Sequence, residues 1–128
     1  MNLLIFTGLT LFLAIGCIEE DYPVRLVFPV LTTSSVSNIT TAAAVSGGNI
    51  TEDGGYDITA RGVCWGSSAN PSVAFPDSVT VDGVGTGQFT SNITGLVANK
   101  TYHVRAYATN SEGTAYGQNI TFTTLEEE

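Results

Sequence analysis

The stretch LVANKTYHVRAYATN, Leu96 to Asn110, decides the fold predicted for this chain. Two sets of side chains alternate along it: Tyr102, Val104, Ala106 and Ala108, and between them His103, Arg105, Tyr107 and Thr109. Successive side chains of a β-strand point to opposite faces of its sheet. The alternation therefore predicts one strand with an apolar face toward a core. His103, Arg105 and Tyr107 are expected to share the outer face.

Further strand patterns fill the chain after its N-terminal segment, and helical patterns are nearly absent. Alternating runs rich in Val, Thr and Ser are separated by turn sequences such as EDGGYD and NSEG. This pattern predicts an all-β antiparallel sandwich of about seven strands over residues 31–125. The expected strands are Val24–Thr32 continuing at Ser35–Asn38, Thr40–Ile50, Asp57–Ser67, Ser78–Val81, Gly87–Thr94, Thr101–Asn110 and Ala115–Thr124.

Three positions around the deciding strand indicate an immunoglobulin-like arrangement. Leu96 lies six residues before Tyr102, a spacing that resembles the tyrosine corner of Ig-like sandwiches. Val104 stands where antibody-type domains carry a cysteine, so the disulfide-bearing type is not expected. On another strand, Val63 and Trp65 share a face that is expected to be the core. Tyr102, Leu96, Val104 and Trp65 are therefore predicted structural residues.

Three segments together resemble a fibronectin type III-like module: DGGYDITARGVCWGSSANPSV, DGVGTGQFTSNITGL and NKTYHVRAYATNSEGTAYGQNITFTT. Such modules are common in Bacteroidetes surface lipoproteins. Ala98 and Lys100 depart from the usual corner residues, and the tryptophan usual on the second strand is missing, so Trp65 is expected to fill its volume. The resemblance implies a fold and an extracellular address, and it implies no conserved catalytic residues.

The N-terminal segment MNLLIFTGLTLFLAIGC carries no charged side chain. Its apolar run Leu3–Gly16 is shorter than the roughly 20 residues of a membrane-spanning helix and has the length of a signal-peptide core. The sequence before Cys17 resembles a bacterial lipobox. That resemblance implies a helical signal peptide at 1–16, removed before a lipidated Cys17. An ordinary secretory signal with an incidental cysteine is the alternative.

Residues 17–30 are expected to hold the lipidated cysteine, an acidic linker and a first edge strand. Glu19, Glu20 and Asp21 resemble the surface-export signal of Bacteroidetes lipoproteins, and a solvated linker is the alternative. These three acids and the three of the tail at 126–128 are six of the chain's twelve. No basic patch exists, which argues against a nucleic-acid partner. The expected location is the bacterial outer membrane, tethered by lipid and exposed at the surface.

Catalytic, metal and cofactor sites are not predicted. With Cys17 in lipid, Cys64 is alone, which excludes a disulfide framework and four-ligand zinc. Cys64 and His103 could form a nucleophile–base pair. The preferred interpretation is a half-buried thiol and a solvent-facing histidine without a preorganised partner. The turn aspartates follow no calcium-loop pattern: Asp53, Asp57, Asp77 and Asp82.

The predicted outer face offers a candidate surface for a protein or polysaccharide ligand. It is expected to combine His103, Arg105 and Tyr107 with Tyr116 and Arg61, because aromatic rings beside arginine suit stacking on sugars or anchoring a protein. Ordinary cross-strand pairing is the alternative. Separately, Asp77-Ser78-Val79 resembles a Bacteroidetes O-glycosylation motif, so Ser78 is a candidate modification site.

The function predicted from these features is that of a membrane-anchored, surface-exposed binding, adhesion or spacer module without catalysis. Two other classes stay open. One is a polysaccharide-binding accessory of a glycan-uptake system, which exposed aromatic residues in a groove would favour. The other is an assembly subunit that polymerises by strand exchange, which a missing strand or a long unpaired edge would favour.

Overall fold

The computed structural model describes residues 27–75 and 78–128. The predicted signal peptide, Cys17, the acidic linker and Asp77 lie outside the described residues, so their proposed roles remain predictions. None of the described residues belongs to a helix with the length and hydrophobicity that a membrane span requires.

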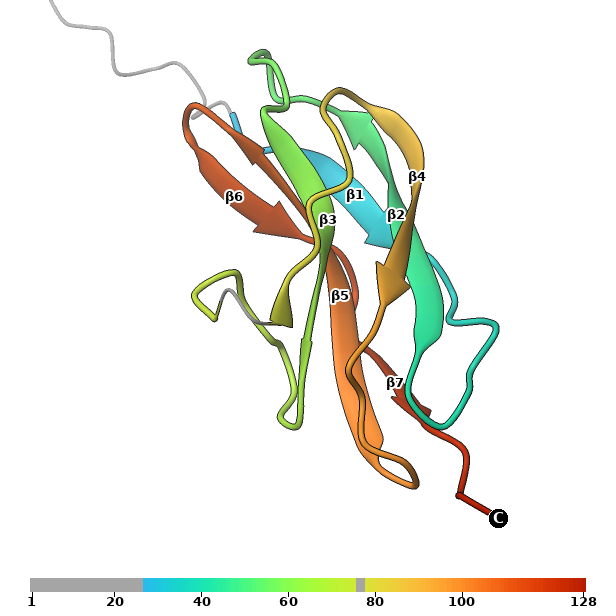
Figure 1. Ribbon diagram of the computed structural model, residues 1–128. Coiled ribbons are helices and arrows are strands. Elements are labelled where there is room, and N and C mark those ends of the chain that lie inside the picture. The colour runs from blue at the N-terminus through green and yellow to red at the C-terminus, as the bar shows by residue number, and fades with distance from the viewer. Residues whose placement is uncertain (1–26, 76–77) are drawn as a thin grey trace, which may run out of the picture.

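Two antiparallel sheets pack face to face, as Figure 1 shows. One sheet has the strand order β1-β2-β4, and the other has the order β3-β5-β6 with β7 also paired to β5. This confirms the predicted seven-stranded all-β sandwich. The strands are β1 (Val30–Thr33), β2 (Ala44–Glu52), β3 (Ala60–Gly66), β4 (Gly87–Ile93), β5 (Thr101–Asn110), β6 (Gly113–Tyr116) and β7 (Ile120–Thr123).

The predicted last strand, Ala115–Thr124, is two strands instead of one. β6 pairs with one half of β5 and β7 with the other half. Gly117 lies between them, and a Cβ there would come within 2.5 Å of the Thr33 hydroxyl. The same hydroxyl accepts a hydrogen bond of 3.0 Å from the backbone N–H of Ala106. The strand breaks because β1 reaches the second sheet at this point.

Two other predicted strands are shorter than expected. The Ser35–Asn38 part of the first strand is reduced to one bridge between Ser37 and Val45. The Ser78–Val81 strand is reduced to one bridge between Val79 and Cys64, followed by a hydrogen bond from the Thr80 N–H to the Val63 carbonyl at 2.9 Å. The chain after residue 78 therefore runs along the edge of β3 before crossing to the other sheet.

Both predicted turns are present. Gly54 and Gly55 in the EDGGYD turn have φ of 76° and 95°, a left-handed conformation that glycine adopts without steric cost. The NSEG turn joins β5 to β6, with Asn110 paired to Gly113.

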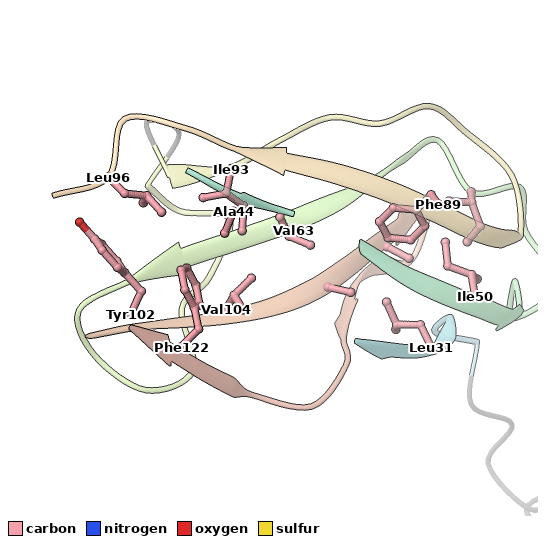
Figure 2. Close-up of a cluster of buried hydrophobic side chains, with 13 residues drawn as sticks. Leu31, Ala44, Ile50, Val63, Phe89, Ile93, Leu96, Tyr102, Val104 and Phe122 are labelled. Carbon is pink, nitrogen blue, oxygen red and sulfur yellow. The ribbon is translucent and has the colours of Figure 1, made fainter. Parts of the chain in front are cut away.

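The core lies between the sheets, and Figure 2 shows Leu96, Tyr102 and Phe122 gathered at one end of it. The Tyr102 hydroxyl accepts a hydrogen bond of 2.9 Å from the backbone N–H of Val97, which confirms the predicted tyrosine corner. The Tyr102 and Phe122 rings stack with centroids 5.7 Å apart. Val104 is fully buried, and Trp65 packs against this core while remaining partly exposed.

Candidate ligand-binding site

The outer face of the four-stranded sheet carries the predicted cluster. His103, Arg105 and Tyr107 lie opposite Gly66, Cys64 and Gly62 of β3, in that order. On the other side of β5, Tyr107 pairs with Tyr116 of β6. Two of the three facing positions on β3 are glycines without side chains. The long side chains of β5 can therefore reach across β3 toward the segment that follows it.

We call residues 67–75 the covering loop, because their backbone forms hydrogen bonds with side chains of this face. The Arg105 Nε donates a hydrogen bond of 2.6 Å to the Pro71 carbonyl, and its Nη2 donates one of 3.4 Å to the Asn70 carbonyl. The Tyr116 hydroxyl accepts one of 3.2 Å from the Val73 N–H. The side chains predicted to contact a ligand therefore hold the chain's own loop.

Tyr107 is buried under the chain that runs along β3. Its side chain is 3 % exposed, and its hydroxyl donates a hydrogen bond of 2.6 Å to the Thr80 carbonyl. Burial raises its pKa to about 12, and the nearby Asp82 carboxylate acts in the same direction. A Cβ at Gly62 would collide with this same Thr80 carbonyl. Tyr107 points outward from the sheet as predicted, but it is not available to a ligand.

Arg61 lies on the opposite face, so the prediction that it lies beside Arg105 is wrong. It precedes Val63 by two residues and therefore points to the same, inner side of β3. Its guanidinium carbon lies 5.2 Å from the centre of the Phe89 ring of the other sheet. It donates hydrogen bonds to three backbone carbonyls of the loop that leads to β4: Asp82 at 2.9 Å, Gly85 at 3.1 Å and Thr86 at 3.1 Å.

Cys64 is fully buried rather than half-buried as predicted. Its thiol contacts the carbonyls of Pro71 at 3.4 Å and Arg105 at 3.6 Å. Burial raises its pKa to about 11, although the charge of Arg105 acts in the opposite direction. The thiol therefore stays protonated at neutral pH, which makes it a poor nucleophile.

His103 has a partner, so the prediction that it has none preorganised is wrong. The Asn119 Oδ1 accepts a hydrogen bond of 2.7 Å from the Asn70 N–H, which fixes the amide orientation. The Asn119 Nδ2 then faces the His103 Nδ1 at 3.0 Å and donates to it. Asn119 joins β5 to the covering loop. No sequence pattern indicated this role, because Asn119 stands in a turn between two strands predicted as one.

A groove of about 640 Å³ opens between the end of β3 and the covering loop. Trp65 and Phe75 are its aromatic residues, and Phe75 is 70 % exposed. Ser78, the candidate glycosylation site, also lines it and donates its N–H to the Phe75 carbonyl at 3.0 Å. No sequence pattern indicated a role for Phe75, because a single phenylalanine between two prolines carries no strand pattern. Among the described residues, acidic, histidine and cysteine side chains form no cluster that could hold a metal.

No protein-family model matches the chain, and comparison with curated protein sequences finds no match. Solved structures do match in fold. The sensor domain of the anti-sigma factor RsgI4 from Pseudobacteroides cellulosolvens is 17 % identical, with a TM-score of 0.55 over 77 % of this chain and 96 % of that one.

Two human domains are also similar. The sixth fibronectin type III domain of human fibronectin type III domain containing protein 3 is 19 % identical, with a TM-score of 0.51 over 88 % of this chain and 95 % of that one. A fibronectin type III domain of human KIAA0970 is 17 % identical, with a TM-score of 0.54 over 81 % and 77 %. The chain therefore has a fibronectin type III-like β-sandwich fold.

Proposed function

We propose that this protein is a non-catalytic binding module of the bacterial surface. A lipid on Cys17 tethers it to the outer membrane, the acidic linker holds the sandwich away from the bilayer, and the groove between Trp65 and Phe75 contacts the ligand. Two or more acyl chains hold a protein on a bilayer for long times, whereas one gives only marginal anchoring.

The observation that carries this proposal is the placement of the two ends of the sandwich. Asn110, at the end of β5, donates a hydrogen bond of 2.7 Å to the Val27 carbonyl, so the chain enters at this end. The Asn99 N–H, just before β5, donates one of 3.0 Å to the Leu125 carbonyl, so the chain leaves at the other end. β5 has ten residues, which span roughly 33 Å. Figure 1 shows the C-terminus at the end of the sandwich opposite to the start of β1.

The groove lies on the half of the sandwich that is remote from the proposed tether. β3 begins opposite Thr109, near the entry end, and ends with Gly66 opposite His103. Trp65 and the covering loop follow at this second end. A lipid anchor that precedes Val27 in the chain would therefore leave the groove facing away from the membrane, as a surface binding module requires.

The strand-exchanging alternative receives less support. A missing strand would favour strand exchange, but β1 already pairs along its length with β2 of the same sandwich. The edge of β3 is also partly covered, because the Asp82 N–H donates a hydrogen bond of 2.7 Å to the Arg61 carbonyl.

Surface labelling tests the proposal, because Lys100 is the only lysine of the chain. The full chain is expressed in a bacterium that exports lipoproteins, and intact cells are treated with a membrane-impermeant amine reagent. We expect wild type to enter the detergent phase and to be labelled at Lys100, with Lys100→Arg as the unlabelled control. Cys17→Ser should stay in the aqueous phase. Wild type that is soluble, or labelled only after lysis, would contradict the proposal.

A further inference from the structure

We propose that the groove between Trp65 and Phe75 binds a neutral saccharide chain. This inference names the ligand class and rests on the proposed function. It is argued from the chemistry of the groove walls and from the way the covering loop is held.

The aromatic side chains supply an apolar contact surface at the groove. Phe75 lines the groove and is 70 % exposed, so most of its ring is accessible to a ligand. Trp65 packs against the core and also lines the groove. A sugar ring has a C–H face that lies well on such rings through dispersion and weak C–H contacts.

The remaining walls are rich in small hydrogen-bonding groups. Four of these polar side chains belong to the covering loop: Ser67, Ser68, Asn70 and Ser72. Ser78 adds a fifth. Each hydroxyl has one donor and two acceptor positions, of which Ser72 already uses one to accept the Ala74 N–H at 3.3 Å, and the amide has two of each. Sugar hydroxyls need this mixture, because each of them is itself a donor and an acceptor.

The described lining of the groove disfavours charged ligands. None of the described residues that line the groove is acidic or basic. The guanidinium of Arg105 on the outer face is engaged by the Pro71 carbonyl and the Tyr116 ring. Bringing a carboxylate, sulfate or phosphate into the groove would remove it from water without a paired charge, which is unfavourable. A neutral saccharide is free of this cost.

The covering loop is held in place before any ligand arrives. Arg105 and Tyr116 bind its backbone from the sheet, and the Asn119 Oδ1 accepts the Asn70 N–H at 2.7 Å. A preorganised loop loses less conformational entropy on binding. Side chains on the outer face of the four-stranded sheet therefore contribute to the groove by holding one of its walls in position.

A protein partner is the competing occupant, and it fits the groove less well. Protein interfaces usually bury about 800 Å² per partner and have apolar anchors within a broad surface. The groove of about 640 Å³ lies within the range of about 300–1,000 Å³ typical of small-ligand sites. It suits a narrow, hydroxyl-rich chain.

Affinity electrophoresis tests the inference on the full chain, in micelles of a detergent without a sugar head group. Native gels contain laminarin, xyloglucan or galactomannan as neutral polysaccharides, and polygalacturonate as the anionic control. We expect at least one neutral polysaccharide to retard the protein and to change the emission of Trp65, the only tryptophan. Phe75→Ala should weaken binding about tenfold, the loss of one stacking contact. Tyr56→Ala, which removes an aromatic residue 44 % exposed in the β2–β3 turn, should not.

Retardation by none of the neutral polysaccharides, stronger retardation by polygalacturonate, or wild-type binding by Phe75→Ala would each overturn the inference. Unfolding midpoints of the two variants separate loss of binding from loss of fold. Failure here is distinct from failure of the proposed function: a chain labelled at Lys100 on intact cells but not retarded would be a surface module with another ligand.

Discussion

The Arg105 guanidinium lies 3.8 Å from the centre of the Tyr116 ring, and its Nε donates at the same time to the Pro71 carbonyl. An arginine beside a tyrosine on an outer strand face has the appearance of a ligand-binding surface. Here the pair binds the covering loop of its own chain. The surface left for a ligand is the groove between the end of β3 and that loop.

Replacing Arg105 should loosen the covering loop. Arg105→Ala removes two hydrogen bonds from a charged donor and one stacking contact, so we expect a loss of about 2 kcal/mol in unfolding free energy. The amide of Val73, which donates to Tyr116, should exchange faster with solvent. Arg105→Lys keeps the charge but lacks the planar guanidinium, and should recover only part of the loss. Urea unfolding and hydrogen exchange measure both. Wild-type exchange at Val73 in the alanine variant would argue against a holding role for Arg105.

Tyr102→Phe should cost about 0.5–1.5 kcal/mol, because the hydroxyl that accepts the Val97 N–H is lost while the ring stays stacked on Phe122. The measurement is the urea midpoint, with Tyr56→Phe at a more exposed tyrosine as the control. An unchanged midpoint for Tyr102→Phe would count against an energetic contribution of the corner.

Asn110 should be more important for stability than its turn position suggests. It is 3 % exposed, and its Nδ2 donates to the carbonyls of Val27 and Asp53 at 2.7 and 2.9 Å. Its Oδ1 accepts the N–H groups of Glu112 and Gly113 at 2.8 and 3.2 Å. Asn110→Asp keeps the shape but places a carboxylate against two carbonyls, so we expect a loss on the order of 3 kcal/mol.

The matched control for this substitution is Asn92→Asp, at an exposed position of β4. Thermal unfolding of both variants at neutral pH makes the comparison. Equal melting temperatures for the two variants would show that the hydrogen bonds of Asn110 to the segment before β1, the β2–β3 turn and the β5–β6 turn do not stabilise the fold.

Alkaline pH should destabilise the fold partly through Tyr107. Its pKa is raised from 10.0 to about 12 in the folded state, so the unfolded chain loses this proton first. The stabilisation is fully present below pH 10 and is lost as the pH rises toward 12. Tyr107→Phe should show a shallower fall in urea midpoint over this interval than wild type. Parallel profiles would indicate that Tyr107 ionises equally in both states.

The fold was predictable because its signals are local and repeated. The alternation around Val104, the corner spacing of Leu96 and Tyr102, and the glycines of the β2–β3 turn each specify their own element. The splitting of the last strand was not predictable, because it depends on Thr33, more than 80 residues away in sequence from Gly117, approaching that position in space.

The site was less predictable than the fold. Strand alternation gave the correct face for Arg105 and Tyr107, but alternation contains no information about what covers a face. The covering loop has no periodic pattern, and its contacts with Tyr116 and Asn119 join residues more than 40 positions apart. The prediction for Arg61 was wrong because it placed Arg61 beside Arg105. The two-residue spacing between Arg61 and Val63 indicates instead that both side chains point to the inner side of β3.

The most direct test of the account is an amide NMR titration of the full chain in the same micelles. The titrant is an oligosaccharide prepared from a neutral polysaccharide that retards the protein. The single indole N–H signal of Trp65 should shift together with the amides of Gly66, Asn70 and Phe75, with one affinity, while the amides of β1 and β2 should not shift. Shifts confined to another surface, or no shift at the Trp65 indole at saturation, would contradict it.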